Sequence, residues 1–167
     1  MITLFYICIL SSRQLAPSSN SLKSFEQSPD IHRQVLDKFE VGFYSTFYDG
    51  SCGPDLSYFY NASTHILHFS GAGLMDNFEE GKAPWACFAP HIRNITFSEG
   101  IQSIGNYAFY QCSYIPNITL PESLTKIGSY SFAYCTKLAQ IFGSITISEL
   151  GDHAFYCCTS LNTVNII

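Results

Sequence analysis

Residues 128–138 read GSYSFAYCTKL, and similar stretches lie 23 residues before and after them, GNYAFYQCSYI at 105–115 and GDHAFYCCTSL at 151–161. In each stretch a Gly is followed at fixed distances by Phe, then Cys, then Leu or Ile. The same offset aligns a further apolar column, formed by Ile95, Ile118, Ile141 and Val164. A fixed period in the twenties indicates a solenoid, in which each repeat buries its apolar face only against its neighbours.

Each repeat is expected to contain one short strand. The sequence NITL at 117–120 alternates polar and apolar residues, and it is followed by Pro121, which cannot donate to a strand ladder. The same pattern predicts parallel strands near 95–97, 118–120 and 141–142. Neighbouring strands should lie about 4.8 Å apart along the solenoid.

A second extended segment and a helical turn are expected to complete the repeat. LTKIG at 124–128 predicts an extended segment that ends at a Gly with positive φ or close packing. The next column holds residues whose side-chain oxygen can cap a helix: Asn106, Ser129 and Asp152. The Phe and Cys columns follow at helical spacing, which predicts a helical turn. We expect one aromatic column to stack inside the solenoid: Phe109, Phe132 and Phe155.

These columns resemble the leucine-rich repeats of the BspA-like surface antigen family of bacteria and mucosal protist parasites. The copy ITLPESLTKIGSYSFAYCTKL at 118–138 is nearly a consensus unit. The upstream sequence resembles the N-terminal cap of that family at Cys52-Gly53, Ser70-Gly71, Gly73, Met75 and Ala83-Pro84-Trp85. The resemblance implies a leucine-rich repeat solenoid of short parallel β-strands and helical turns, with a β-hairpin cap at its N-terminal end.

The chain is therefore expected to have four parts. Residues 1–16 are a candidate signal peptide, because the apolar run 2–10 has the length of a signal-peptide core, although a buried strand or a start codon inside a longer gene would also explain it. Residues 17–51 should contain one short helix, within SPDIHRQVLDKF. Residues 52–91 form the cap, in which LSYFY and ILHFS predict a hairpin. Residues 92–167 hold the repeats of period 23, incomplete at the C-terminus.

Composition favours a protein that works outside the cell. Hydrophobic residues make up 47% of the chain, which is enough for a core, whereas charged residues make up only 13%. The net charge is −5 and no basic run occurs, so nucleic acid is not expected as a partner. No segment has the length of a transmembrane helix. Three sequons offer glycosylation sites in a secretory compartment: Asn61, Asn94 and Asn117.

Neither a catalytic site nor a metal or cofactor site is predicted. A column of Cys side chains runs along one line and cannot surround a metal ion, so the thiols are interpreted as small buried hydrophobes. Cys52 and Cys87 are a candidate disulfide in the cap. No Ser/His/Asp or Cys/His grouping interrupts the repeat pattern, and the column Tyr107, Tyr130 and His153 is expected to be an exposed aromatic column on the outer face.

Two functions agree with these patterns. The first is a non-catalytic cell-surface or secreted protein that mediates adhesion, or binds surface proteins or glycans of a host or of other microbes. Its predicted binding row on the inner sheet is Thr96, Thr119, Phe142 and Asn165, which is uncharged. The alternative is a structural spacer or a fragment of a longer repeat protein. In either case the apolar strand at 164–167 is expected to promote self-association through the last repeat.

Overall fold

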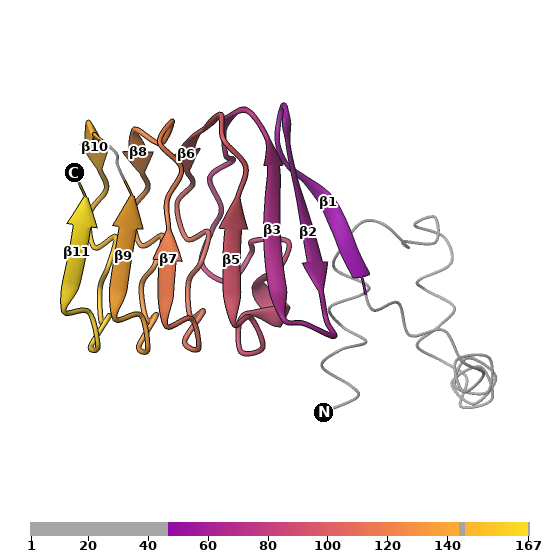
Figure 1. The fold of residues 1–167 in the computed structure, drawn as a ribbon. Helices are drawn as coiled ribbons and strands as arrows, with labels where there is room; N and C mark the ends of the chain where they lie inside the picture. The colour runs from indigo at the N-terminus through magenta and orange to yellow at the C-terminus, as the bar shows by residue number, and fades with distance from the viewer. Residues whose placement is uncertain (1–46, 144–145, 167) are drawn as a thin grey trace, which may run out of the picture. The chain divides into compact units, whose positions relative to one another are not determined.

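The computed structural model describes residues 47–143 and 146–166 (Figure 1). The candidate signal peptide at 1–16 and the short helix expected within SPDIHRQVLDKF lie outside the described residues. The described chain winds into repeats whose strands form two rows.

The first row of strands runs the length of the described chain (Figure 1). Its first four strands form one sheet: β1 (Phe47–Gly53), β2 (Leu56–Asn61), β3 (Ile66–Gly71) and β5 (Asn94–Phe97). Its last three form another: β7 (Asn117–Thr119), β9 (Gln140–Gly143) and β11 (Thr163–Ile166). We call the surface formed by the outward side chains of both sheets the strand face.

The second row is a single parallel sheet. It contains β4 (Gly73–Leu74), β6 (Ile101–Ile104), β8 (Lys126–Ile127) and β10 (Glu149–Leu150). These short strands correspond to the second extended segment that the repeat pattern predicts. One further element, the 3-10 helix η2 (Ala86–Phe88), lies in the cap between β4 and β5.

The cap joins the repeats through strand pairing. β1 pairs with β2 and β2 with β3, both antiparallel, whereas β3 pairs with β5 in the parallel sense. The expected cap began at Cys52, but β1 begins at Phe47 and pairs along most of its length with β2. The sequence FYDGSCG did not predict this strand, because Gly and Asp have low strand propensity.

The turn that follows each second-row strand is not helical, so the predicted helical turn is wrong. Tyr107 and Gln111 have positive φ values of 54° and 60°. The N–H of Phe109 donates to the carbonyl of Ser131 in the next repeat (2.7 Å), as Tyr107 does to Ser129 (3.0 Å). A helix would use these donors internally. In a run of successive turns, apolar residues recur every three residues, as they do on one face of a helix. The sequence pattern therefore could not distinguish these turns from a helix.

The expected cap residues of that helix have another role. The side-chain oxygen of Asn106 accepts a hydrogen bond from the backbone N–H of Ser129 (2.8 Å), and Asn77 does the same for Asn106 (2.9 Å). Asn106 therefore links its repeat to the next one. The neighbouring Gly column allows this approach, because a Cβ on Gly128 would lie 2.6 Å from the nitrogen of Asn106.

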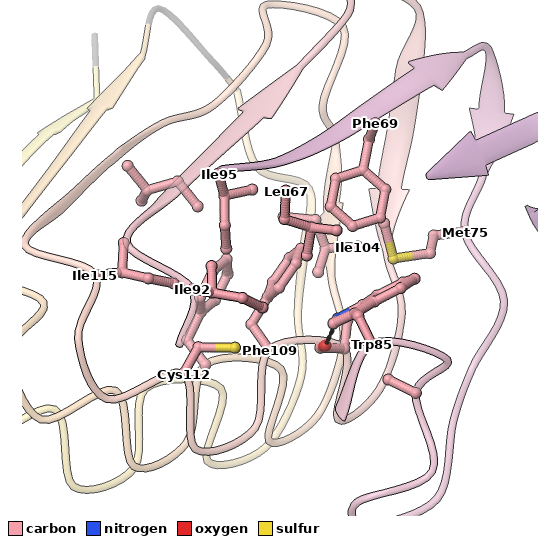
Figure 2. Close-up of a cluster of buried hydrophobic side chains, with 14 of the residues drawn as sticks. Leu67, Phe69, Met75, Trp85, Ile92, Ile95, Ile104, Phe109, Cys112 and Ile115 are labelled. Carbon is pink, nitrogen blue, oxygen red and sulfur yellow. Dashed lines mark hydrogen bonds between the residues drawn. The ribbon is translucent and has the colours of Figure 1, made fainter. Parts of the chain in front are cut away.

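The aromatic column stacks in the core as predicted. Ring centroids of Phe109 and Phe132 are 5.1 Å apart, and those of Phe132 and Phe155 are 5.3 Å apart. At the cap end, Trp85 is fully buried, packs edge-on against Phe69, and donates from Nε1 to the carbonyl of Ala108 (2.6 Å; Figure 2). The cap is therefore bound to the first repeat through its indole ring.

The proposed disulfide between Cys52 and Cys87 is wrong. Cys52 is a free thiol with 1% of its surface exposed, whereas the side chain of Cys87 is exposed on η2. Because Cys52 is a free thiol, it forms no bridge with Cys87. Burial, together with the nearby charge of Asp76, raises the pKa of Cys52 to about 12.

Candidate functional site

The first row of strands is interrupted between β5 and β7. The two strands are neighbours in Figure 1, yet β5 is the edge of one sheet and β7 the edge of the other. In the following repeats, Ala139 donates its N–H to the carbonyl of Pro116 (2.8 Å), and Asn162 donates to Ala139 (3.0 Å). Pro116 occupies the same column but has no N–H to donate toward Arg93. One link between β5 and β7 is therefore missing.

A second proline removes a second donor. Ser98, which directly follows β5, donates its N–H to the carbonyl of Phe69 on β3 (2.9 Å). Pro121 occupies the corresponding position after β7, so the equivalent bond to Phe97 cannot form. Proline residues thus stand on both sides of β7 and account for the break in the ladder.

A cleft of about 320 Å³ lies at this break. Its polar lining consists of two amides, two hydroxyls and one carboxylate: Asn94, Asn117, Thr96, Thr119 and Glu99. Its apolar lining comes from Ile95, Phe97, Leu120 and Pro121. Amides and hydroxyls both donate and accept hydrogen bonds, so the cleft can hold a ligand that carries both kinds of group.

The predicted binding row lies on consecutive strands. Thr96 and Thr119 line the cleft from its two sides. The strand register then aligns Thr119 with Phe142, and Phe142 with Asn165. Thr119 is exposed, and Thr96 and Phe142 are half-buried. The structure therefore brings together the four residues that the repeat pattern selected, and whether they bind a ligand stays a prediction.

The row continues into the cap, which the repeat pattern did not predict. His68 is aligned with Thr96, and their side chains are hydrogen-bonded (Nδ1 to Oγ1, 2.8 Å). Phe59 is aligned with His68, is 40% exposed and stacks on Phe47 with centroids 5.2 Å apart. The period of 23 could not find these residues, because His68 lies 28 residues before Thr96 and β2 runs antiparallel to β3. The alternation in LSYFY and ILHFS was the available signal.

The three sequons lie on or beside the strand face. Asn61 ends β2, and its side-chain oxygen accepts hydrogen bonds from the N–H groups of Ser63 (2.9 Å) and Thr64 (3.1 Å). Asn94 and Asn117 are exposed and both line the cleft. A glycan on either of these two side chains would cover the cleft.

The aromatic column at the turns packs mainly on itself. The ring centroids of Tyr107 and Tyr130 are 5.1 Å apart and their planes differ by 5°. Those of Tyr130 and His153 are 4.9 Å apart and their planes differ by 2°. Because the ring faces cover each other, mainly their edges remain for a ligand. The column is better explained as a link between repeats than as a site.

The Cys column offers no reactive thiolate. Cys112 and Cys135 are buried, and burial raises the pKa of both thiols well above the ordinary value. Burial also raises the pKa of Cys158 to about 11. Within 47–143 and 146–166, no three His, Cys, Asp or Glu side chains are grouped so that they could hold a metal ion. Over the same residues, no helix is long and apolar enough to span a membrane.

Comparisons with known proteins agree with this architecture. A sequence model of the BspA type leucine rich repeat region matches residues 86–167 with six copies. The structure resembles the crystal structure of a leucine-rich repeat protein from Eubacterium ventriosum, with a TM-score of 0.59 and 20% identity. The match covers 71% of this chain and 40% of that protein, and it bears on the fold alone. No curated protein matches the chain.

Proposed function

We propose that the protein is a non-catalytic binding module, because residues 86–167 match the sequence model of the BspA type leucine rich repeat region. It acts at the cell surface or after secretion, and it attaches to proteins or glycans on host or neighbouring cells. The binding surface is the strand face, with the cleft between β5 and β7 at its centre.

The cleft is the observation that carries this proposal. It interrupts an otherwise continuous row of strands, and its lining combines the amides of Asn94 and Asn117 with the hydroxyls of Thr96 and Thr119. Sugar hydroxyls and peptide groups both match such a lining, because each donates and accepts hydrogen bonds. The row through Thr119 and Phe142 is uncharged, so the contacts that a ligand makes with the row alone should depend only weakly on salt.

Export from the cell is supported by the sequence. The surface is poor in charge, since charged residues make up 13% of the chain. The sequon at Asn61, which does not line the cleft, and the apolar run at 2–10 agree with passage through a secretory compartment. The cleft binds its ligand on molecules whose Asn94 and Asn117 carry no glycan.

The test is a triple substitution in the row, Thr96→Lys, Thr119→Lys and Phe142→Lys. Beads coated with parent or variant protein are compared for attachment to epithelial cells and to immobilised mucin. The matched control carries Gln102→Lys, Thr125→Lys and Ser148→Lys, which place the same charge at exposed positions with the same 23-residue spacing, along the second row. We expect the control to attach like the parent and the row variant to lose attachment.

Circular dichroism decides how the result is read. If the row variant keeps the parent spectrum and also keeps its attachment, binding through the strand face is wrong. If it unfolds, the single variants Thr119→Lys and Phe142→Lys are compared in the same assay.

One observation supports the alternative function, a structural spacer or part of a longer repeat protein. In the last described repeat, Leu150 on β10 is 61% exposed and Val164 on β11 is 53% exposed. Another repeat, or a second copy of the chain, would cover this apolar end. If the protein is a structural spacer, it extends or assembles through this end. The row variant and the parent should then attach to cells and mucin equally.

A further inference from the structure

Half of the basic side chains in the described residues surround one tyrosine ring. The described ranges contain four Lys or Arg residues: Lys82, Arg93, Lys126 and Lys137. The guanidinium carbon of Arg93 lies 4.3 Å from the ring centroid of Tyr114, and Nζ of Lys137 lies 4.2 Å from the same centroid. One cation comes from the preceding repeat and the other from the following repeat. Within the described part of the chain, half of the Lys and Arg charge therefore lies at one place.

Among the residues that the structure describes, these two cations have no carboxylate partner. Across 47–143 and 146–166, the ion pair that forms joins Lys126 to Glu149 (2.6 Å). Arg93 instead donates from Nη1 to the carbonyls of Pro90 (3.1 Å) and Ile92 (3.4 Å). These bonds hold the guanidinium in place and leave Nε and Nη2 without a hydrogen bond to any described residue. Tyr114 is 42% exposed, so a ligand can reach the charged groups.

The charged group adjoins the candidate binding cleft along the chain. Arg93 directly precedes Asn94, the first residue of β5, and Tyr114 lies three residues before Asn117, the first residue of β7. Both asparagines line the cleft. A ligand that places a neutral part among the amides and hydroxyls of the cleft would therefore carry an anionic part toward Arg93 and Lys137.

We propose that Arg93, Tyr114 and Lys137 bind the carboxylate or sulfate group of an acidic glycan. The free edge of the guanidinium can donate two parallel hydrogen bonds to such a group, and the Lys137 ammonium adds a point charge. The negative face of an aromatic ring attracts cations, so the Tyr114 ring offsets part of the repulsion between Arg93 and Lys137. The glycan class rests on the proposed function, since it follows from the amide and hydroxyl lining of the neighbouring cleft.

The test uses two double variants that remove the same charge. Arg93→Gln with Lys137→Gln removes the proposed site, and Lys82→Gln with Lys126→Gln is the control. The full chain, produced without N-glycans, is titrated with sialyllactose, sulfated lactose and neutral lactose, and binding is measured by calorimetry. We expect one or both acidic sugars to bind, with affinity about tenfold or more weaker in the site variant and unchanged in the control. Raising the salt concentration should weaken binding to the parent.

The two acidic sugars separate a carboxylate-specific site from a sulfate-specific one. The proposal is overturned if neither acidic sugar binds more tightly than lactose, or if both double variants lose affinity equally, which would indicate only net charge. Equal binding of a poly-glutamate peptide would identify an acidic protein as the partner instead. If acidic sugars fail while attachment to mucin still depends on Thr96, Thr119 and Phe142, this inference is wrong and the proposed function stands. If acidic sugars do not bind and the row variant attaches to mucin like the parent, both this inference and the proposed function are wrong.

Discussion

The thiol of Cys135 donates a hydrogen bond to the carbonyl oxygen of Phe109 in the preceding repeat, 3.2 Å away. Cys158 makes the same contact with Phe132, at 3.1 Å. The Cys column therefore does more than fill space, because each of these thiols links two repeats. The contact requires the protonated thiol, and burial favours that form by raising the pKa of Cys135 well above 9.0 and that of Cys158 to about 11.

These pKa values predict a loss of stability at alkaline pH. A thiol whose folded pKa is raised above its unfolded value contributes stability that is fully present below the unfolded value, 9.0 here, and is lost as pH rises toward the folded value. We expect the melting temperature to fall between pH 9 and pH 11, and to fall less steeply in Cys135→Ala. Thermal melts followed by circular dichroism measure this, and equal slopes for variant and parent would contradict it.

The stacked Phe column predicts a graded cost of truncation. Phe132 is 1% exposed and stacks on a ring at each side, so Phe132→Ala should lower the free energy of unfolding by about 3–5 kcal/mol. Phe155 is only partly buried at the last described repeat, and Phe155→Ala should cost less. Urea unfolding of both variants tests the order, and the reverse order would remove Phe132 from the centre of the core.

Two buried serines should respond in opposite directions to the same substitution. Ser131 is fully buried and its hydroxyl oxygen has no hydrogen-bond partner in the described structure, so Ser131→Ala should be neutral or stabilising. The hydroxyl oxygen of Ser103 accepts a hydrogen bond from the N–H of Met75 (3.0 Å), and Ser103→Ala would leave that donor buried without a partner. We expect Ser103→Ala to cost about 1–3 kcal/mol. Equal effects in chemical denaturation would show that the Ser131 hydroxyl is satisfied.

The exposed end of the last described repeat predicts self-association. Val164 is aligned with the buried Ile141 but is 53% exposed, because β11 is the edge of its sheet. Sedimentation velocity should show a concentration-dependent dimer or larger species, and Leu150→Lys with Val164→Lys should shift the protein toward monomer. A monodisperse parent at all concentrations would contradict this prediction.

The sequence predicted the strand positions that recur in every repeat, but it did not predict the hydrogen bonds that join one repeat to the next. Ile95, Ile118 and Ile141 are buried on strands within one residue of the expected positions, because a strand alternates strictly and the period fixes its place. The helical turn failed because the N–H of Phe109 bonds to the next repeat, and a contact between repeats leaves no trace in the spacing of one repeat.

The candidate site was only half predictable for a related reason. Thr96 and Thr119 follow from alternation, and the structure places both at the cleft. The cleft itself depends on Pro116 and Pro121, which have no N–H to donate. Ala139, in the column of Pro116, and Ser98, in the column of Pro121, both donate hydrogen bonds to a neighbouring repeat or strand. The effect of the prolines therefore appears only when the repeats are compared in the structure. The cation pair around Tyr114 joins residues from different columns, so no single column contains it.

Hydrogen–deuterium exchange with and without mucin tests most directly whether the strand face binds at the break between β5 and β7. The facing edges of these strands are not hydrogen-bonded to each other, so some of their amides should exchange faster than those of β9 in the free protein. We predict that mucin slows exchange in peptides spanning 94–99 and 117–121 and leaves the second-row segments 101–104 and 126–127 unchanged. Unchanged exchange at β5 and β7 under conditions in which the protein is bound, or protection confined to the second row, would contradict binding at the cleft.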